Sequence, residues 1–183
     1  MYKILYILIQ IISFLFIPVS YEKEIIIKNN DENWNNLKDV INDNQNDKEL
    51  ILRFEDDYYD VNFENVFSSL ELMISSDVFF IGNKNGTVFD FMENIIGYNI
   101  LYLRNKGDTL KFENIIFKNF AVKQLILYSV PLFSIRTTTD NFNLIYTNCT
   151  IQDSKAAFIS IYATNPKSIS SSYSVQIDNC IFK

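Results

Sequence analysis

The sequence Phe-Glu-Asn-Ile-Ile-Phe at residues 112–117 returns as Tyr-Thr-Asn-Cys-Thr-Ile at 146–151 and as Ile-Asp-Asn-Cys-Ile-Phe at 177–182. In each copy an apolar residue lies two positions before the Asn, and two more lie one and three positions after it. This alternation predicts a strand, a short bend at the Asn, and a second strand. With a looser copy at Asn83, the successive bends Asn83, Asn114, Asn148 and Asn179 are 31, 34 and 31 residues apart. A period in this range, built on strands, indicates a solenoid whose turns stack.

The composition agrees with a fold that has many tight turns. Asn accounts for about one residue in eight, well above ordinary usage, whereas the chain has only 4 Gly and 3 Pro. Asn adopts the left-handed backbone conformation more readily than most other residues, and its amide can bond to the backbone or to a stacked Asn. Codon bias in an AT-rich genome is an alternative cause of the high Asn content. It does not explain why Asn takes the same place in each repeat.

Aligning the repeats at their Asn predicts which side chains stack in the core. The predicted stacks are Phe112 with Tyr146 and Ile177, Ile115 with Cys149 and Cys180, and Phe117 with Ile151 and Phe182. The period-2 alternation places other residues of the same strands in solvent, namely Lys111, Glu113, Thr150 and Gln176. Burial of each large apolar side chain contributes about 1.5–3 kcal/mol, so these stacks would hold successive turns together.

Residues 1–20 have the pattern of a signal peptide. Lys3 supplies a positive charge, and a nearly unbroken apolar run extends from Ile4 to Ile17. About fourteen apolar residues fit the hydrophobic region of a signal peptide and are short for a spanning helix, which needs about 20. Pro18 is unfavourable near a cleavage site, so an uncleaved anchor is the alternative. We predict a secreted protein, extracellular or at the cell surface, with no membrane segment after signal cleavage.

Residues 21–49 are predicted to contain a strand and a capping helix. The strand is expected from Glu24 to Asn29. Between residues 31 and 42 the apolar residues Trp34, Leu37, Val40 and Ile41 recur at helical spacing. Asp31 or Asn33 is available as the N-cap of this helix. An amphipathic helix here would cover the open end of a solenoid, which otherwise exposes apolar core and strand edges.

Residues 50–183 are predicted to form the solenoid itself. Leu50 to Phe54 is expected to be its first full strand, and the turn from Gly82 to Gly86 is wider than the later bends. From there each turn is expected to hold three strands, the first of which are Asn99–Leu103, Leu132–Ile135 and Phe158–Tyr162. Each of these strands is followed by a polar connector, at residues 104–109, 136–143 and 164–172.

The chain resembles the pectin-lyase-like superfamily of β-helix proteins. The resemblance is carried by the units Asn-Ile-Ile-Phe, Asn-Cys-Thr-Ile and Asn-Cys-Ile-Phe and by the turn Ile81-Gly82-Asn83, which comes after a capping helix. The resemblance covers residue 50 to the C-terminus. It implies a mainly β fold, a right-handed parallel β-helix, with stacked Asn at the bend between the second and third strands of each turn. The Asn-, Phe- and Tyr-rich style is also similar to large extracellular β-helix proteins of some eukaryotic microbes, including scaffold-type proteins of surface polysaccharide-degrading assemblies.

The resemblance offers a test for catalysis. Polygalacturonase-type members carry an Asp pair, a third Asp, a Gly-His-Gly and an Arg-x-Lys, but this chain has no His, and Arg136-Thr137-Thr138 lacks the Lys. The pair Asp56-Asp57 is of the kind that glycoside hydrolysis needs, yet it follows the first strand, where a charged turn is more typical of solvated surface. A lyase needs a basic Arg or Lys beside calcium-binding acids, and the three arginines lie in separate turns; Arg104 and Arg136 precede equivalent strands and could lie near one edge.

These observations favour a non-catalytic structural or adhesive module within a larger extracellular or surface protein. The alternative is the N-terminal part of a polysaccharide lyase or glycoside hydrolase whose catalytic turns lie beyond residue 183. The row of connectors predicts a recognition surface for a polysaccharide or cell-surface glycan, because Tyr rings and Asn amides suit sugars. A net charge of −6 argues against nucleic acid and anionic membrane. No cofactor or calcium-loop pattern is predicted.

Two cysteines occupy equivalent places on successive turns. Cys149 and Cys180 each follow a bend Asn, and stacked strands lie about 4.8 Å apart, inside the Cα separation that a disulfide accepts. An exported chain makes a disulfide possible. Side chains on adjacent parallel turns point the same way, however, which favours a stacked pair of unbonded thiols.

Two N-glycosylation sequons are present, Asn85-Gly86-Thr87 and Asn148-Cys149-Thr150. The first lies in a glycine-containing turn, and we predict a glycan at Asn85. The second contains a bend residue whose amide is expected to engage its neighbours, so we predict that Asn148 is mostly unmodified.

The last predicted strands, residues 177–183, are not followed by a polar cap. An uncovered turn exposes apolar side chains and strand edges. We therefore expect either further turns of the same chain, which would make this sequence a fragment, or another β-helix chain that covers this end.

Overall fold

The structure is a computed structural model, and it describes residues 22–45, 48–61, 71–93, 99–103, 107–120, 131–138, 141–163 and 174–183. The predicted signal peptide lies outside these residues. Within the described part of the chain, no helix has the length and apolar character needed to span a membrane.

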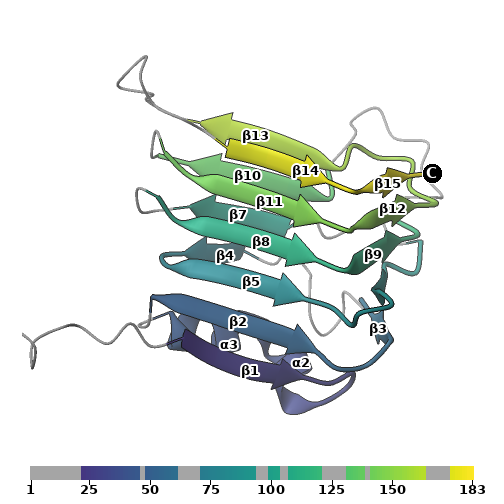
Figure 1. Cartoon of the computed structure of the whole chain (residues 1–183), viewed down its shortest axis with the longest axis horizontal. Helices are drawn as coiled ribbons and strands as arrows, with labels where there is room; N and C mark the ends of the chain where they lie inside the picture. Colours follow the sequence, from purple (N-terminus) through teal and green to yellow (C-terminus); the bar gives the residue numbers. More distant parts are fainter. Residues whose placement is uncertain are drawn as a thin grey trace, which may run out of the picture.

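The chain forms three parallel sheets that the backbone visits in turn (Figure 1). Sheet A contains, in spatial order, β1 (Glu22–Ile27), β2 (Glu49–Phe54), β5 (Asp77–Ile81), β8 (Thr109–Glu113), β11 (Asn143–Thr147) and β14 (Ser174–Asp178). Sheet B contains β3 (Tyr58–Asp60), β6 (Thr87–Asp90), β9 (Ile115–Lys118), β12 (Thr150–Gln152) and β15 (Ile181–Phe182). Sheet C contains β4 (Glu71–Ile74), β7 (Asn99–Leu103), β10 (Phe133–Thr137) and β13 (Ile159–Ala163).

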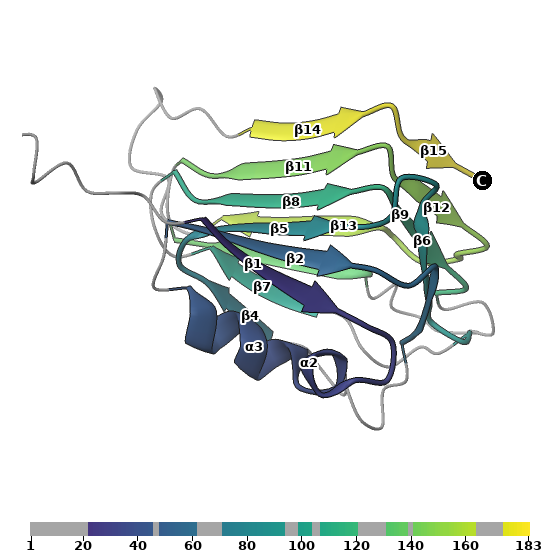
Figure 2. The same cartoon turned by 60° about the horizontal axis from the view of Figure 1, so that its bottom comes forward.

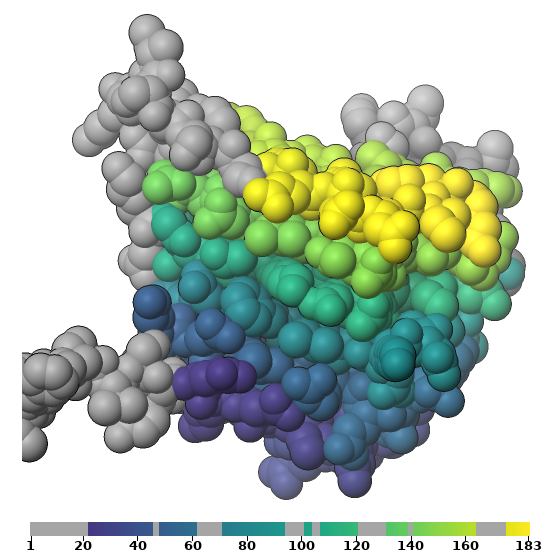
Figure 3. Space-filling view, viewed as in Figure 1, coloured from purple at the N-terminus to yellow at the C-terminus, as the bar shows by residue number. Residues whose placement is uncertain are grey.

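The order of the strands confirms the predicted fold, a right-handed parallel β-helix of about four turns. The chain runs from sheet A to sheet B to sheet C and then returns to sheet A one level higher. Every strand pair is parallel, as expected when each turn stacks on the one before. The space-filling view shows the same order as bands of colour that advance from one end of the molecule to the other (Figure 3).

The core is built from side-chain columns in the predicted register. Tyr146 pairs with Phe112 on one side and with Ile177 on the other, and Ile151 pairs with Phe117 and Phe182. The first column continues downward as an aromatic stack: the ring centroids of Phe112 and Tyr146 are 5.1 Å apart with an interplanar angle of 9°. Phe80 and Phe54 extend this stack, at 4.9 Å from Phe112 to Phe80 and 6.0 Å from Phe80 to Phe54.

The predicted Asn ladder forms at three of the four expected positions. Asn114, Asn148 and Asn179 have φ of 57°, 53° and 52°, so each supplies a one-residue left-handed bend between sheets A and B. The Nδ2 of Asn179 donates to the Oδ1 of Asn148 at 2.6 Å, and the Nδ2 of Asn148 donates to the Oδ1 of Asn114 at 3.3 Å. We call these three residues the Asn ladder.

Asn83 does not belong to the Asn ladder, which corrects the prediction. Its φ is not positive, and its Nδ2 donates to the Glu55 carbonyl at 2.8 Å and to the Asp57 carboxylate at 3.0 Å. The reason is the length of the turn, because residues 82–86 fill the place that a single Asn takes in the later turns. Gly82 is required where this wide turn meets the next level, since a Cβ there would lie 2.3 Å from the Asn114 carbonyl oxygen.

Two short helices cover the lower end of the solenoid, below β4 and β1 (Figure 2). They are α2 (Glu32–Asn35) and α3 (Leu37–Asn44), and they place the fully buried Trp34, Leu37 and Ile41 against the first turn. Of the two N-cap candidates, Asp31 caps the helix, because its carboxylate accepts a hydrogen bond from the Trp34 amide at 2.7 Å. The single predicted helix is divided at Asn36, whose φ and ψ of −113° and 29° are not helical.

The side chain of Gln45 protects the lower edge of sheet C. Its Nε2 donates to the Met73 carbonyl at 2.7 Å, and its Oε1 accepts from the Ser75 amide at 2.7 Å. One amide side chain thus takes the place of a strand residue along β4, whose other edge pairs with β7. Sheet A starts earlier than expected, because β1 pairs with β2 along its whole length rather than forming a separate segment before residue 50.

Candidate functional site

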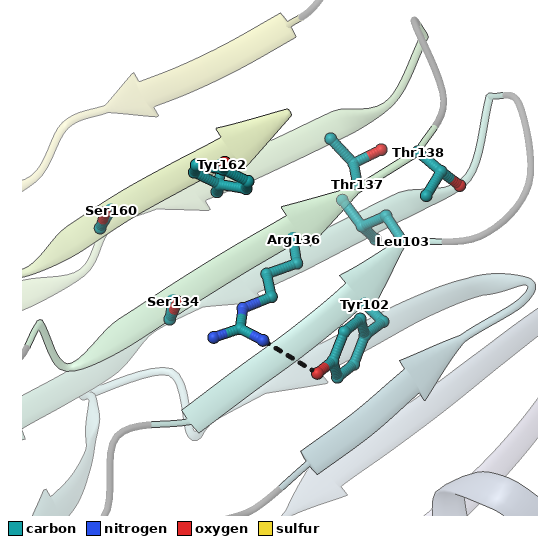
Figure 4. Close-up of a pocket in the computed structure, with 8 residues that line it drawn as sticks. All are labelled: Tyr102, Leu103, Ser134, Arg136, Thr137, Thr138, Ser160 and Tyr162. Atoms are coloured by element: carbon teal, nitrogen blue, oxygen red, sulfur yellow. Dashed lines mark hydrogen bonds between the residues drawn. The ribbon is translucent and has the colours of Figure 1, made fainter. Parts of the chain in front are cut away.

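The outer face of sheet C carries a recess of about 630 Å³ (Figure 4). Three levels of the solenoid contribute to it. Arg136 on β10 pairs in register with Tyr102 on β7 below it and with Tyr162 on β13 above it. Because neighbouring parallel strands are about 4.8 Å apart, these three side chains form one continuous column. We call Tyr102, Arg136 and Tyr162 the Tyr–Arg–Tyr column.

The lower half of this column is ordered by a direct contact. The Nη1 of Arg136 donates a hydrogen bond to the Tyr102 hydroxyl oxygen at 3.2 Å, and the Arg136 guanidinium carbon lies 5.8 Å from the centre of the Tyr102 ring. Figure 4 shows the guanidinium directed along the sheet toward Tyr102. A cation over an aromatic face gains about 0.5–1 kcal/mol at an exposed site, so the pair holds Arg136 in a defined direction.

The remainder of the recess is lined by hydroxyl groups. Ser134 and Ser160 form a second column beside the first, since they pair with each other on β10 and β13. Thr138 directly follows β10, and the Tyr162 side chain is 65% exposed. Among the described residues, no carboxylate lines the recess and Arg136 has no ion-pair partner. Arg136 is therefore a cation available for an anionic group.

This arrangement suits a ligand with hydroxyl groups and a negative substituent. An Arg guanidinium binds a carboxylate or sulfate through paired N–H groups, and the two Tyr rings offer flat apolar faces with polar tips. Serine and threonine hydroxyls both donate and accept hydrogen bonds. Among the described residues that line the recess, none is an acid, and the groups present are a guanidinium, two phenols and hydroxyls, which are hydrogen-bonding groups.

Sequence reasoning singled out Arg136 but missed Tyr102 and Tyr162. The expected strands Leu132–Ile135 and Phe158–Tyr162 begin one residue before the observed β10 and β13. A slip of one residue moves a side chain to the opposite face of a sheet. If the expected strands are aligned at their first residues, Tyr102 pairs with Ile135, whereas in the structure it pairs with Arg136. The column could be found in the sequence by aligning the outward-facing residues of the sheet C strands in each of the two registers that differ by one residue.

The connectors are placed only in part. Gly107 donates to the Asn141 carbonyl at 2.8 Å and Asn143 donates to the Asp108 carbonyl at 3.0 Å, so the first two connectors lie side by side where the chain enters sheet A. Arg136 itself belongs to β10 rather than to a connector, which corrects the expected boundary. Arg104 and the connector at 164–172 lie outside the described residues.

The pair Asp56-Asp57 has structural partners. The Asp56 carboxylate accepts from the Asn29 amide at 2.7 Å, and the Asp57 carboxylate accepts from the Asn83 side chain at 3.0 Å. The two acids therefore join neighbouring turns at the sheet A–sheet B corner. Arg53 is also engaged, since its Nε and Nη2 contact the Glu24 carboxylate at 2.8 and 3.0 Å. Arg53 lies on sheet A, not on the face that carries Arg136.

The two cysteines are unbonded, as the stacking argument predicted. Each thiol donates to a carbonyl one level below, Cys149 to Phe112 and Cys180 to Tyr146, both at 3.5 Å. Both side chains thus point the same way, which leaves the sulfurs stacked rather than facing each other. Burial raises the pKa of the Cys149 thiol to about 12, so it is not a nucleophile at neutral pH.

Within the described ranges, no group of three or more Asp, Glu, Cys or His side chains is arranged to hold a metal ion. Comparison with known proteins gives no match to a family model, to a curated protein or to a solved structure.

Proposed function

We propose that this chain is a non-catalytic module of a secreted or cell-surface protein, related to the pectin-lyase-like β-helices, that binds a glycan with acidic groups. The observation that carries the proposal is the Tyr–Arg–Tyr column. An exposed arginine that contacts Tyr102, pairs in register with Tyr162 and lies beside a column of hydroxyls is a poor arrangement for a core and a suitable one for an acidic sugar.

The β-helix supplies the rigidity that such binding requires. Parallel pairing fixes the backbone of the three strands that carry the column, and the contact between Arg136 and Tyr102 orders two of its side chains, so less conformational freedom is lost on binding. A polysaccharide is an extended ligand, and sheet C presents an extended face on which consecutive levels meet consecutive sugar rings. This matches a structural or adhesive role and does not require a catalytic group.

The proposal is tested by electrophoresis of the native chain through gels that contain acidic or neutral polysaccharides. We expect acidic polysaccharides to retard the wild-type chain and Arg136→Gln to move freely. Arg53→Gln is the matched control, because Arg53 is an exposed arginine on another sheet. Equal retardation of the wild-type and Arg136→Gln chains by acidic polysaccharides would refute the proposal, and so would retardation by the neutral ones alone.

A further inference from the structure

A second recess lies at the corner between sheets A and B and follows the Asn ladder. Its volume is about 420 Å³. Its floor is the Asn ladder together with the outward column Ile116, Thr150 and Ile181, which pair in register on β9, β12 and β15. Its wall is the wide turn, through Lys84, Asn85 and Gly86. We call this recess the ladder groove.

Asn85 is exposed at the edge of the ladder groove and begins a sequon. The turn that carries it rests on the groove floor, because a Cβ on Gly86 would lie 3.0 Å from the Cδ1 of Ile116. Gly86 also has a φ of +95°, a conformation that side chains other than glycine rarely adopt. The position of Asn85 beside Ile116 is thus fixed by the backbone.

We propose that Asn85 carries an N-linked glycan and that the first sugars of this glycan lie in the ladder groove. The proposal depends on the export of the chain, which is part of the proposed function. N-acetylglucosamine suits the groove because its apolar ring face and acetamido methyl can cover Ile116 and the Thr150 methyl. Its hydroxyl groups can meet the amides of the Asn ladder.

The covalent step uses a lipid-pyrophosphate-linked oligosaccharide as the donor. The Nδ2 of Asn85 forms a bond to C1 of the first N-acetylglucosamine, the bond between C1 and the pyrophosphate oxygen breaks, and Nδ2 loses one proton. No oxidant or reductant is needed. The lipid pyrophosphate leaves with the electron pair of the broken bond.

The burial of Thr87 indicates that the glycan is transferred before this part of the chain folds. Thr87 is fully buried, and its hydroxyl accepts from the Asn83 amide at 2.8 Å and donates to the Asp56 carbonyl at 3.3 Å. The hydroxyl that defines the sequon is therefore inaccessible in the folded chain. We infer that the glycan is transferred before the wide turn folds, and that folding then brings the sugar onto the groove floor.

The second sequon differs in its surroundings. Asn148 is the central residue of the Asn ladder, bonded to Asn114 below and to Asn179 above. A sugar on its Nδ2 would project between two neighbours that are about 4.8 Å away on either side. A glycan at Asn85 and a glycan at Asn148 would also compete for the same groove, so we expect modification at Asn85 alone.

Occupancy is measured first, by glycopeptide mass mapping of the chain secreted from a eukaryotic host. We expect a glycan at Asn85 and unmodified peptide at Asn148. An unmodified Asn85 overturns the proposal, and so does full occupancy at Asn148. This result is independent of the sheet C site, because Asn85→Gln is expected to leave the polysaccharide retardation of the native chain unchanged.

Docking in the groove is measured second, as a coupling between the glycan and the floor. The melting temperatures of the glycosylated chain and of Asn85→Gln are compared in three backgrounds: wild type, Ile116→Ala and Val88→Ala. Val88 is the matched control, since it lies one level below Ile116 in the same outward column but does not line the groove. We expect loss of the glycan to lower the melting temperature by several degrees in the wild-type and Val88→Ala backgrounds.

In the Ile116→Ala background we expect the same loss to have less than half of this effect. Because each comparison is made within one background, a general destabilisation by Ile116→Ala does not affect the conclusion. A glycan effect that is equal in all three backgrounds, or that is zero in the wild type, would show that the sugar extends into solvent and would overturn the docking.

Discussion

The hydroxyl group of Tyr146 offers a precise test of the core. Tyr146 is fully buried in the aromatic stack, and its hydroxyl has no hydrogen-bond partner among the described residues. Burial raises the pKa of this phenol well above its ordinary value. Removing the oxygen by Tyr146→Phe leaves the ring stacked on Phe112 and eliminates one unsatisfied polar group.

The expected effect is a gain in stability. A buried polar group without a partner costs about 1–3 kcal/mol. We expect Tyr146→Phe to raise the free energy of unfolding by about 1 kcal/mol, at the low end of this range. The gain is limited because the atoms around the removed oxygen lose a few contacts. For a chain of this size, 1 kcal/mol corresponds to about 2–4 °C in melting temperature.

Tyr59→Phe is the matched control. The Tyr59 ring is also fully buried, but its hydroxyl donates to the Ile27 carbonyl at 2.6 Å and accepts from the Asp56 amide at 3.2 Å. The Ile27 carbonyl keeps a second donor in the Glu55 amide, so we expect a loss of only about 1–1.5 kcal/mol. Thermal and urea unfolding of both variants measure the difference. A Tyr146→Phe variant destabilised as much as Tyr59→Phe would refute this account of the core.

Three further predictions concern the bend and its neighbours. Asn148→Gly removes the ladder amide but keeps the left-handed backbone, so it should cost less in urea unfolding than Asn148→Ala, by about 1 kcal/mol; equal losses would mean that the φ of 53° is not what selects Asn. Gly82→Ala should lower the free energy of unfolding by at least about 2 kcal/mol, because the added Cβ meets the Asn114 carbonyl oxygen. Gly107→Ala should lower it by about 1 kcal/mol, because Gly107 has a φ of +91° but open space around the added Cβ. The reverse order of the two losses would contradict the packing of the wide turn. Burial raises the pKa of the Cys149 thiol to about 12, so this thiol stays protonated in the folded chain while it ionises from about pH 9 in the unfolded chain. The free energy of unfolding should therefore fall from pH 9 toward pH 12, and it should fall less steeply in Cys149→Ala. Identical slopes of melting temperature against pH in the two proteins would rule this out.

The sequence predicted sheets A and B better than sheet C. The bends at Asn114, Asn148 and Asn179 are only one or two residues long, with a single left-handed Asn in each, so the strands on both sides of them have a fixed register. Strands of sheet C are separated from the next bend by connectors whose length varies, so a pattern of alternating residues leaves the register open by one position. This is why Arg136 was recognised while its pairing with Tyr102 was not. Its pairing with Tyr162 was missed because Arg136 was assigned to a connector rather than to β10.

A second left-handed bend was also missed. Asn119 and Asp153, with φ of 59° and 53°, follow sheet B on successive turns and are 34 residues apart, the same spacing as Asn114 and Asn148. The repeated spacing was visible in the sequence, but Asp153 replaces Asn at the second position and hides the motif. The division of the helix at Asn36 follows from the low helix propensity of the Asn residues around Trp34.

The central claim is that the Tyr–Arg–Tyr column binds a glycan through its acidic groups. The most direct measurement is a calorimetric titration of the chain with a uronic-acid oligosaccharide and with the same oligosaccharide after reduction of its carboxyl groups. We predict about tenfold tighter binding of the acidic form, since a hydrogen bond to a charged group contributes about 1.5–3 kcal/mol, and loss of this preference in Arg136→Gln. Equal affinity for the two forms, or a preference that survives in Arg136→Gln, would contradict the account.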